Sequence, residues 1–282
     1  FLMLKSGEID IDGLEPMQYE RQLDKPFHSK FATLELPSHS YTYLGFNLRL
    51  KKFQDPRVRE ALSLAINRQE IIDLLFLNHG KVCTGPFLPG SKGFNDAVKA
   101  PQHDIARAKA LLKAAGYDAA HPLTFEIATS NSNAIRPYAA EILQRQLLDI
   151  GVEVTLRVME WQAFLNTVVS PRKFETVLLG WALSLTPDPY ALWHSQSDVP
   201  GGFNLVGYHS SQTDRLIERM ESSTDPETIA AFQRQIFAHI AHDNPYLFLV
   251  IPNEINVYSR RISGIKPTIN GIWEDYIDWE KR

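Results

Sequence analysis

The sequence predicts an α/β fold, in which the strands of a sheet alternate with helices that cover it. The clearest observation is a strand, a helix and a second strand, joined by short connections over residues 123–158. This arrangement favours parallel pairing of the two strands through a right-handed crossover. A second observation is the composition of the 282 residues, 44% hydrophobic and 22% charged, which is typical of a soluble globular protein with a sizeable core. The length allows one large domain or two smaller ones.

Strands are predicted where short apolar or alternating runs are bounded by turn residues. In chain order they are expected over 8–12, 31–36, 41–48, 123–129, 152–158, 176–179 and 246–251, with 256–258 as an extension of the last. Ligand sites of α/β sheets lie where parallel strands end. Polar residues are therefore expected to gather at the ends of the strands that follow residue 123.

Helices are predicted from apolar periodicity together with capping residues. Asp55 can cap a helix whose first position is Pro56. The last helix begins at Thr224 or Asp225, and the T-x-x-E pattern from Thr224 fits a capping box. In chain order the helices are expected over 15–23, 55–77, 104–115, 135–150, 161–169, 211–221 and 224–242.

A long loop after residue 179 carries the strongest functional signal. It contains five aromatic residues among Ser, Thr, Asn and Gly, namely Trp181, Tyr190, Trp193, Phe203 and Tyr208. Loops of this length inside a compact domain are usually functional or disordered, and disordered segments are poor in aromatic residues. Amphipathic rings beside small polar groups suit the wall of a ligand cleft. The alternative is that the rings fill a small core beneath the loop.

Several function classes receive no support. A net charge of −4 gives no case for nucleic acid, and no apolar run approaches the roughly 20 residues of a transmembrane helix. The lone Cys83 is interpreted as a small packed hydrophobe. No histidine spacing predicts a metal site, and no cofactor motif is found. Asp188 and Asp198 could pair as catalytic carboxylates, but no His or Lys is placed beside them by spacing, so catalysis is not predicted.

Five segments together resemble the second lobe of family 5 extracellular solute-binding proteins, the oligopeptide and dipeptide receptors of ABC importers. The order and spacing of the segments also agree with that family. They are YTYLGFNLRLKKFQDPRVREALSLAINRQEII (41–72), GPFLPGS (85–91), DIARAKALLKAAGY (104–117), IGVEVTLRVMEWQAF (150–164) and GGFNLVGYHSSQTDRLI (201–217).

This resemblance implies a class II periplasmic-binding fold, whose second lobe has a mixed sheet flanked by helices. Residues 1–42 are then expected to be a remnant of the first lobe, residues 43–251 the ligand-binding second lobe, and residues 252–282 a return segment to the first lobe. The N-terminal half of the first lobe would be absent, so the chain is expected to be a truncated form.

The resemblance implies a receptor and not an enzyme. Such a receptor captures a peptide or similar small polar solute between its lobes and delivers it to the permease subunits of an ABC transporter. Its location is expected to be periplasmic, or outside the membrane on a tether. Two alternatives stay open: a hydrolase on a related α/β scaffold, and a receptor of the same family for a metal chelate, an opine or a sugar.

In peptide-binding members, the strand after the second βα unit ends in a Trp, followed three residues later by an Asp that pairs with the ligand's α-amino group. Trp181 matches the Trp, whereas Ser184 stands at the Asp position. A hydroxyl cannot supply the charge of a carboxylate opposite an ammonium. Either the ligand has no free amine at this point, or Asp188 replaces the missing carboxylate.

Four further residues are candidate ligand contacts, each with a structural alternative. Asn204 and Tyr208 lie in the GGFNLVGY segment, where Asn204 could instead hydrogen-bond within its own loop. Asn47 follows a strand, and Asn131 follows the strand 123–129, where a simple turn role is equally expected. The ligand-binding residues predicted from sequence are therefore Trp181, Ser184, Asp188, Asn204, Tyr208, Asn47 and Asn131.

Overall fold

The computed structural model describes residues 1–186, 188–268, 271–274 and 276–281. The chain forms two compact units. Unit 1 contains Phe1–Ser38, Ile72–Lys81 and Ile251–Arg282, and unit 2 contains His39–Ile71 and Val82–Val250. The assignment of residue ranges to two lobes made from the sequence stays a prediction.

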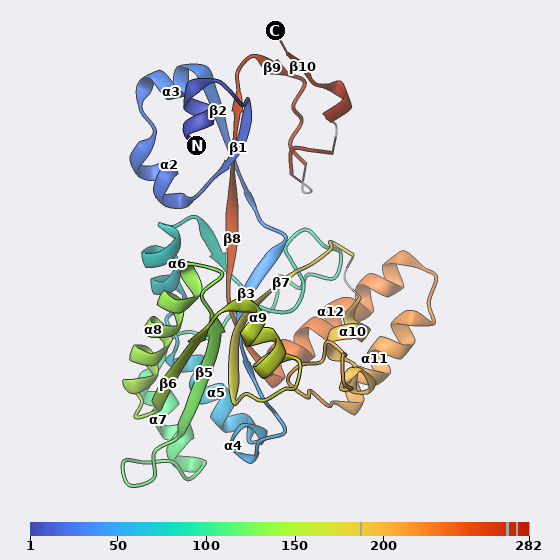
Figure 1. Ribbon diagram of the computed structural model, residues 1–282. Coiled ribbons are helices and arrows are strands. Elements are labelled where there is room, and N and C mark those ends of the chain that lie inside the picture. The colour runs from blue at the N-terminus through green and yellow to red at the C-terminus, as the bar shows by residue number, and fades with distance from the viewer. Residues whose placement is uncertain (187, 269–270, 275, 282) are drawn as a thin grey trace. The chain divides into compact units, whose positions relative to one another are not determined.

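Unit 2 is built on a mixed sheet, as the sequence predicted (Figure 1). Its strands lie in the order β8, β3, β7, β5, β6. Strand β5 pairs in parallel with β6 and β7, whereas β3 is antiparallel to β7 and β8. The bounds are β3 (Ser40–Phe46), β5 (Thr124–Ser130), β6 (Glu153–Met159), β7 (Thr176–Ala182) and β8 (Tyr246–Ser259), of which β8 continues into unit 1.

Helices lie on both sides of this sheet. Helix α8 packs on β5 and β6 (Figure 1). The Trp193 ring of α10 meets the Tyr246 ring of β8, and α11 and α12 pack against each other. The helices that lie wholly in unit 2 are α4 (Lys51–Gln54), α5 (Pro56–Ala65), α7 (Ile105–Ala114), α8 (Ile135–Leu148), α9 (Trp161–Phe164) with a π-helix (Leu165–Val169), α10 (Pro189–Trp193) with a 3-10 turn (Ser195–Ser197), α11 (Ser211–Glu221) and α12 (Pro226–Asp243).

The helix predicted over 55–77 is wrong as one element, because the structure breaks it into α5 and α6 (Arg68–Phe76). The break falls at Ile66, whose backbone is extended. The Asn67 N–H donates to the side-chain oxygen of Gln146 at 3.1 Å, and the Asn67 side chain accepts from the Glu70 N–H at 3.2 Å. A partner distant in sequence thus stops one helix, and Asn67 starts the next.

Two other expectations need correction. The cap of α12 is Asp225, whose carboxylate accepts from the Thr228 N–H at 2.9 Å, so the capping box from Thr224 is not formed. Strand β7 does not stop at residue 179 but continues to Ala182, because its end pairs with the start of β3, Trp181 opposite Tyr41. The aromatic loop therefore begins after Trp181 and not before it.

Unit 1 is a smaller α/β assembly around the second part of β8. This strand pairs antiparallel with β1 and β2, and the short β4 also pairs with β8. A cluster of apolar side chains fills the core: Leu4, Leu14, Phe27, Phe31, Ile255 and Val257. The elements are α1 (Leu2–Ser6), β1 (Ile11–Leu14), α2 (Pro16–Gln22), α3 (Lys25–Lys30), β2 (Phe31–Pro37), β4 (Gly80–Val82), β9 (Ile262–Ser263), a 3-10 turn (Tyr276–Asp278) and β10 (Glu280–Lys281).

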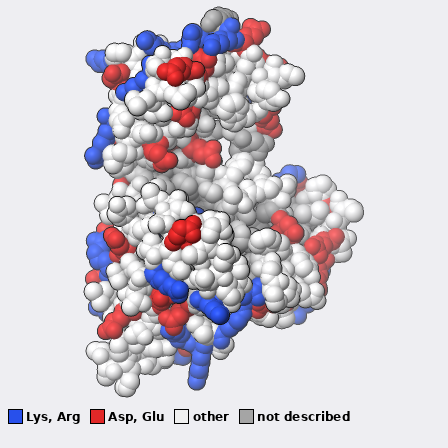
Figure 2. All heavy atoms as spheres, viewed as in Figure 1, with Lys and Arg blue, Asp and Glu red and all other residues white. Residues whose placement is uncertain are grey.

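The surface carries charges of both signs. On the face drawn in Figure 2, acidic and basic side chains are scattered among uncharged residues. Among the described residues, no helix combines the length and the apolar character needed to cross a bilayer.

Candidate functional site

The candidate site lies at one edge of the unit 2 sheet. Strands β5 and β7 are parallel neighbours, with Ile127 opposite Thr176, so their carboxyl ends lie at the same edge. Trp181 lies near the end of β7, and Asn131 follows the end of β5. This is the edge at which open α/β sheets bind ligands.

Trp181 is partly buried, with one part of its ring supported by other aromatic rings. It lies parallel to Tyr43 with ring centroids 6.3 Å apart, and its indole N–H donates to the Tyr246 hydroxyl at 3.4 Å. The ring of Phe203, itself 55% exposed, meets Trp181 edge-on at 6.0 Å. Trp181 and Phe203 thus form an aromatic surface that is held from beneath by the buried Tyr43.

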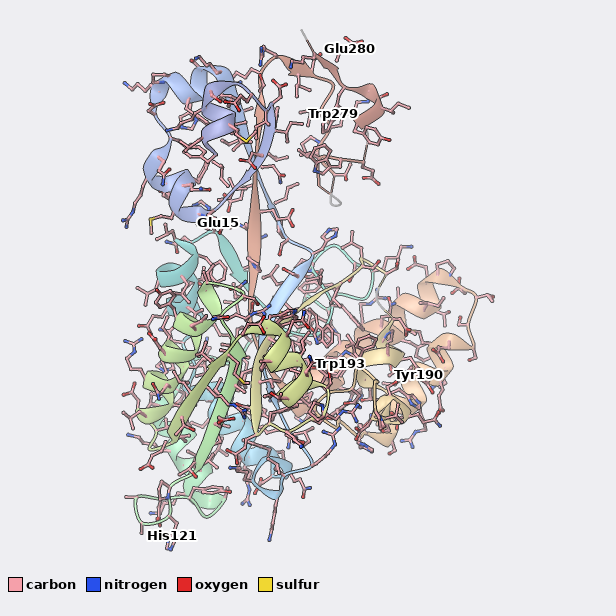
Figure 3. The ribbon with its side chains drawn as sticks, in the orientation of Figure 1. Glu15, His121, Tyr190, Trp193, Trp279 and Glu280 are labelled. Atoms are coloured by element: carbon pink, nitrogen blue, oxygen red, sulfur yellow. The ribbon has the colours of Figure 1, made fainter. Side chains whose placement is uncertain are left out.

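The other rings of the loop divide into two groups. Trp193 is fully buried and meets Tyr246 at 4.7 Å, and Tyr208 is also buried, so both fill a small core beneath the loop. Tyr190 is partly buried and stacks on His194 at 4.2 Å. Figure 3 shows Trp193 beside the sheet and Tyr190 farther out among the helices. The small-core alternative therefore holds for Trp193 and Tyr208.

Asn204 makes three hydrogen bonds within its own loop. Its side-chain N–H groups donate to the carbonyl oxygens of Tyr208 at 2.8 Å and His194 at 3.3 Å, and its side-chain oxygen accepts from the Tyr208 N–H at 2.9 Å. The residue is fully buried. The structure thus shows that Asn204 hydrogen-bonds within its own loop, which was the alternative to ligand contact. A contact between Asn204 and the ligand stays a prediction.

Tyr208 is anchored to the helices beneath the loop. Its hydroxyl donates to the Asp243 carboxylate at 2.6 Å and lies 3.0 Å from the Thr213 hydroxyl. Burial, followed by the hydrogen bond to Asp243, raises the pKa of Tyr208 well above the usual tyrosine value, so the phenol stays neutral. With the hydroxyl engaged in this way, the side chain fixes the loop to α11 and α12.

Asn47 is also buried and engaged by the protein. Its side-chain N–H donates to the Phe174 carbonyl oxygen at 2.9 Å, and its side-chain oxygen accepts from the Arg49 guanidinium at 3.1 Å. Asn131, in contrast, is exposed in the turn after β5, where its backbone N–H donates to the Met159 carbonyl oxygen. Of these two, only Asn131 presents its side chain to solvent.

Ser184 and Asp188 lie on the exposed segment that follows β7. The Ser184 hydroxyl lies 3.1 Å from the Thr186 hydroxyl and accepts from the Thr186 N–H, which forms a local turn. Asp188 caps α10 by accepting from the Tyr190 N–H at 2.8 Å. A role for Asp188 as a replacement for the carboxylate missing at Ser184 stays a prediction.

Asp198 is held in an ion-pair cluster that ties its loop to other segments of unit 2. Its carboxylate pairs with Arg49, with Arg172 at 2.9 Å and with His209 at 2.9 Å. Burial acts to raise the pKa of Asp198, but the hydrogen bonds from His209 and Arg49 outweigh it and lower the pKa. An ionised and fully paired carboxylate is unsuited to general acid catalysis.

Arg136 lies near this edge of the sheet and was not among the residues predicted from the sequence. It lies in the first turn of α8, and its guanidinium reaches the end of β7: a Cβ on Gly180 would lie 3.0 Å from Nη2 of Arg136. No described residue forms an ion pair with Arg136, and its Nε is buried without a hydrogen-bond partner. The only signal in the sequence was its place shortly after a strand end.

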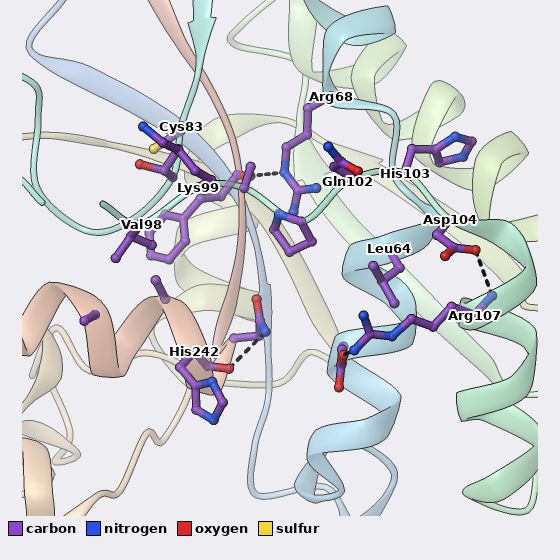
Figure 4. Close-up of a pocket in the computed structure, with 18 of the residues that line it drawn as sticks. Leu64, Arg68, Cys83, Val98, Lys99, Gln102, His103, Asp104, Arg107 and His242 are labelled. Atoms are coloured by element: carbon purple, nitrogen blue, oxygen red, sulfur yellow. Dashed lines mark hydrogen bonds and ion pairs between the residues drawn. The ribbon is translucent and has the colours of Figure 1, made fainter. Parts of the chain in front are cut away.

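A separate cavity of about 810 Å³ lies between α5, α12 and the segment 98–104 (Figure 4). Several of its charged groups are used by the protein itself. The Arg68 Nε donates to the Phe248 carbonyl oxygen at 2.7 Å, Asp104 caps α7, and Arg107 pairs with Glu60. The Thr84 hydroxyl, which also lines this cavity, is buried and has no hydrogen-bond partner among the described residues.

Cys83 is buried, and its thiol donates to the Gly85 carbonyl oxygen at 3.4 Å. Burial raises the pKa of the Cys83 thiol to about 12, so the thiolate nucleophile is not formed at neutral pH. Within the described ranges, no cluster of three His, Cys, Asp or Glu side chains is placed to hold a metal ion.

A mixed sheet with a supported aromatic surface at the ends of its parallel strands is typical of a ligand-binding α/β domain. The profile described as "Bacterial extracellular solute-binding proteins, family 5 Middle" matches residues 1–203. The chain belongs to this family, whose members are solute-binding receptors and not enzymes.

Two curated relatives agree with this assignment. The oligopeptide-binding protein AppA of Bacillus subtilis is 29% identical over 279 residues, which cover 93% of this chain and 50% of AppA. The glutathione-binding protein GsiB of Salmonella typhimurium is 26% identical over 269 residues, which cover 93% of this chain and 52% of GsiB. The chain therefore spans about half the length of the curated relatives it matches.

Solved structures share the fold. AppA from Bacillus subtilis in complex with a nonapeptide matches with a TM-score of 0.83 and 26% identity, over 100% of this chain and 57% of that chain. The periplasmic binding protein DppA from Helicobacter pylori in complex with the peptide STSA matches with a TM-score of 0.83 and 25% identity, over 99% of this chain and 54% of that chain. The α/β fold with a mixed sheet flanked by helices is thus that of periplasmic binding proteins.

Proposed function

We propose that this chain supplies a ligand-binding surface of a receptor that captures a peptide or similar small polar solute and delivers it to an ABC transporter. The observation that carries the proposal is the family membership, together with the supported aromatic surface of Trp181 and Phe203 at the strand ends. AppA and DppA, whose structures hold peptides, support the peptide as the solute class.

In this proposal Trp181 contacts the solute by stacking, and the exposed segment after β7 supplies backbone and hydroxyl groups around it. Ser184, Asp188 and Asn131 are exposed at or near this edge and are the polar contacts. Asn47, Asn204 and Tyr208 act indirectly, because their side chains are engaged within the protein. Solute binding favours one conformation of the receptor only by the difference between the solute's affinities for the two conformations.

The proposal also places the receptor outside the cytoplasmic membrane, in the periplasm or on a tether, where it contacts the permease subunits of the transporter. The extracellular description of the family supports this location. No step of bond formation or cleavage is part of the function.

The test is incubation of the protein with a panel of di- to nonapeptides and glutathione, followed by native mass spectrometry and thermal denaturation. A receptor retains the solute unaltered, and a ligand at 100 times its Kd stabilises the folded state by about 2.7 kcal/mol. The matched control is the Trp181→Ala variant with the same panel. Conversion of any panel member to products at a catalytic rate would instead establish an enzyme.

A further inference from the structure

We propose that the rings of Trp181 and Phe203 form a corner that accepts an aromatic or branched apolar side chain of the solute, and that Asp198 positions Phe203 in this corner. This inference rests on the receptor function proposed above, and it names the class of solute. Three observations carry it: the geometry of the two rings, their lack of a free hydrogen-bonding group, and the ion pairs that hold the chain around Phe203.

The two rings present apolar surface on two sides of one corner. Their planes meet at 84° with the centroids 6.0 Å apart, and Phe203 is 55% exposed. The polar group of the corner is the indole N–H of Trp181, which already donates to the Tyr246 hydroxyl at 3.4 Å. A polar group of the solute would lose water here without gaining a hydrogen bond from either ring, whereas an apolar side chain gains from its burial.

The corner lies on the face of the sheet that the aromatic loop covers. Tyr246 accepts from the Trp181 indole, and its ring also meets the buried Trp193 of the same loop at 4.7 Å. Tyr43 is buried and lies parallel to Trp181 at 6.3 Å. Trp181 is therefore held by the sheet, whereas the position of Phe203 depends on the loop alone.

Asp198 ties this part of the loop to other segments of unit 2. It lies five residues before Phe203, and its side chain is only 12% exposed. Its carboxylate pairs with Arg49, which follows β3, with Arg172 in the turn before β7, and with His209 at the end of the loop. A sheltered carboxylate shared by two guanidinium groups fixes geometry better than an exposed ion pair does.

The two arginines also hold the backbone on both sides of Phe203. A guanidinium N–H of Arg172 donates to the carbonyl oxygen of Gly202 at 3.3 Å. A guanidinium N–H of Arg49 donates to the carbonyl oxygen of Leu205 at 3.1 Å. The backbone that carries the Phe203 ring is thus attached, before and after it, to the two partners of one carboxylate.

The backbone of Arg172 shows that this arrangement is imposed by its contacts. Its φ is 56°, in the left-handed region that residues with a side chain rarely adopt. Such a conformation persists only where the surrounding structure holds it. Because Asp198 orients the guanidinium groups of both Arg172 and Arg49, its loss would loosen both attachments of Phe203. Asp198 is therefore a positioning residue that acts through Phe203.

The test compares peptides that differ in one side chain. Trialanine is titrated beside three peptides in which phenylalanine replaces the first, second or third alanine, and beside the three matching lysine peptides. We expect at least one phenylalanine peptide to bind roughly 10- to 100-fold more tightly than trialanine, the range for burial of one aromatic side chain. The lysine peptides test the alternative that Asp188, on the segment after β7, draws a cation to the rings.

Phe203→Ala should abolish the preference for phenylalanine and leave the affinity for trialanine within about twofold. Asp198→Asn should reduce the same preference, and it should weaken the nuclear Overhauser effect between the Phe203 and Trp181 rings in the free protein. The double variant should show no further loss beyond that of Phe203→Ala, because Asp198 acts through that ring. A general loss of structure would instead weaken the binding of trialanine as well.

The matched control is Glu70→Gln, which removes an ion pair of unit 2 with Arg145 outside the loop. It should change neither the preference nor the nuclear Overhauser effect. Circular dichroism and a thermal melt check that each variant is folded. If Asp198→Asn does not fold, Arg172→Lys takes its place, because it keeps the positive charge but donates fewer hydrogen bonds.

Equal affinity of the wild type for trialanine and for every phenylalanine peptide would overturn the inference, as would a lysine peptide that binds as tightly as the best phenylalanine peptide. Additive losses in the double variant would remove the positioning role. Failure of all these peptides to bind up to millimolar concentration also overturns the inference. Capture of another solute without turnover would then leave the receptor function standing, whereas turnover of a peptide would remove the receptor function itself.

Discussion

Trp181 and Trp193 belong to the same aromatic segment but have different surroundings. Trp193 is fully buried against Tyr246, whereas Trp181 is partly exposed beside Phe203. The aromatic pattern alone did not separate them, because their burial depends on residues of β3 and β8; only the family resemblance singled out Trp181 as a ligand contact. The side-chain environment, and not the residue type, decides which ring is available to a solute.

The first prediction follows from this difference. Trp181→Ala should weaken solute binding by about tenfold or more while lowering the free energy of unfolding by only about 1 kcal/mol. Trp193→Ala should instead lower the free energy of unfolding by about 3–5 kcal/mol, because it leaves a buried cavity. Calorimetry with a captured solute and urea denaturation measure the two effects. An unchanged dissociation constant for Trp181→Ala would assign Trp181 to packing alone.

At the scale of elements, the sequence predicted the parallel unit of β5, α8 and β6, because its periodicity is strong and its connections are short. It did not predict the break between α5 and α6, since the group that stops α5 is the side chain of Gln146 on another helix. It also ended β7 too early, because the pairing of Trp181 with Tyr41 depends on β3. Long-range partners explain both errors.

One side chain, that of Asn204, ties together residues 194–208 of the loop that precedes α11. Gly202 lies so close to the Ser197 carbonyl oxygen that a Cβ would approach it to 2.2 Å, and Asn204 then bonds to Tyr208 and His194. The sequence left Asn204 between ligand contact and loop formation. The hydrogen bonds within the loop explain why an amide, with both donors and an acceptor, occupies this position.

The second prediction tests this element. Asn204→Asp should lower the free energy of unfolding by about 2–4 kcal/mol, because a buried carboxylate cannot donate to the two carbonyl oxygens. The solute affinity should fall only as far as the substitution disorders the loop. The NMR signal of the Trp181 indole N–H should shift together with this fall in affinity. Asn131→Asp is the control, since the Asn131 side chain is exposed and the change should have little effect on stability. Full stability of Asn204→Asp would contradict the loop-forming role.

At the scale of the whole molecule, unit 1 is assembled from three separate stretches of chain, and His79 joins them. Its two ring nitrogens lie 2.9 Å from Glu35 of β2 and 3.0 Å from Glu20 of α2, and Asn253 of β8 also donates to Glu35. Burial acts to lower the pKa of His79, but the hydrogen bonds to Glu35 and Glu20 outweigh it and raise the pKa. Tyr19 packs edge-on against the His79 ring.

The third prediction is a pH dependence of stability. Because the pKa of His79 is raised on folding, its contribution is complete below the unfolded pKa of about 6.5 and is lost as the pH rises through the folded pKa. Burial acts to raise the pKa of Glu35, but the hydrogen bonds from Asn253 and His79 lower it, so its contribution is present above about pH 4.5 and is lost on further acidification.

His79→Gln should therefore be less stable than the wild type by about 1 kcal/mol at pH 5.5, a figure that allows for solvent screening, and this difference should shrink by pH 8. Urea denaturation at the two pH values measures it. His121→Gln is the control, because His121 is exposed beside Asp118 and its substitution should change neither curve. A difference that grows with pH would contradict the prediction.

The central strand of unit 1 comes from the second part of β8, residues 251–259, and β1 and β2 pair with it rather than with each other. Residues 1–38 therefore lie far before residues 251–259 in the sequence, with unit 2 between them. During synthesis, β1 and β2 cannot pair with β8 until unit 2 has left the ribosome, so the edges that later pair with β8 lack this partner during that interval. The yield of folded protein should therefore depend on how well β1 and β2 are protected from aggregation and proteolysis during that interval.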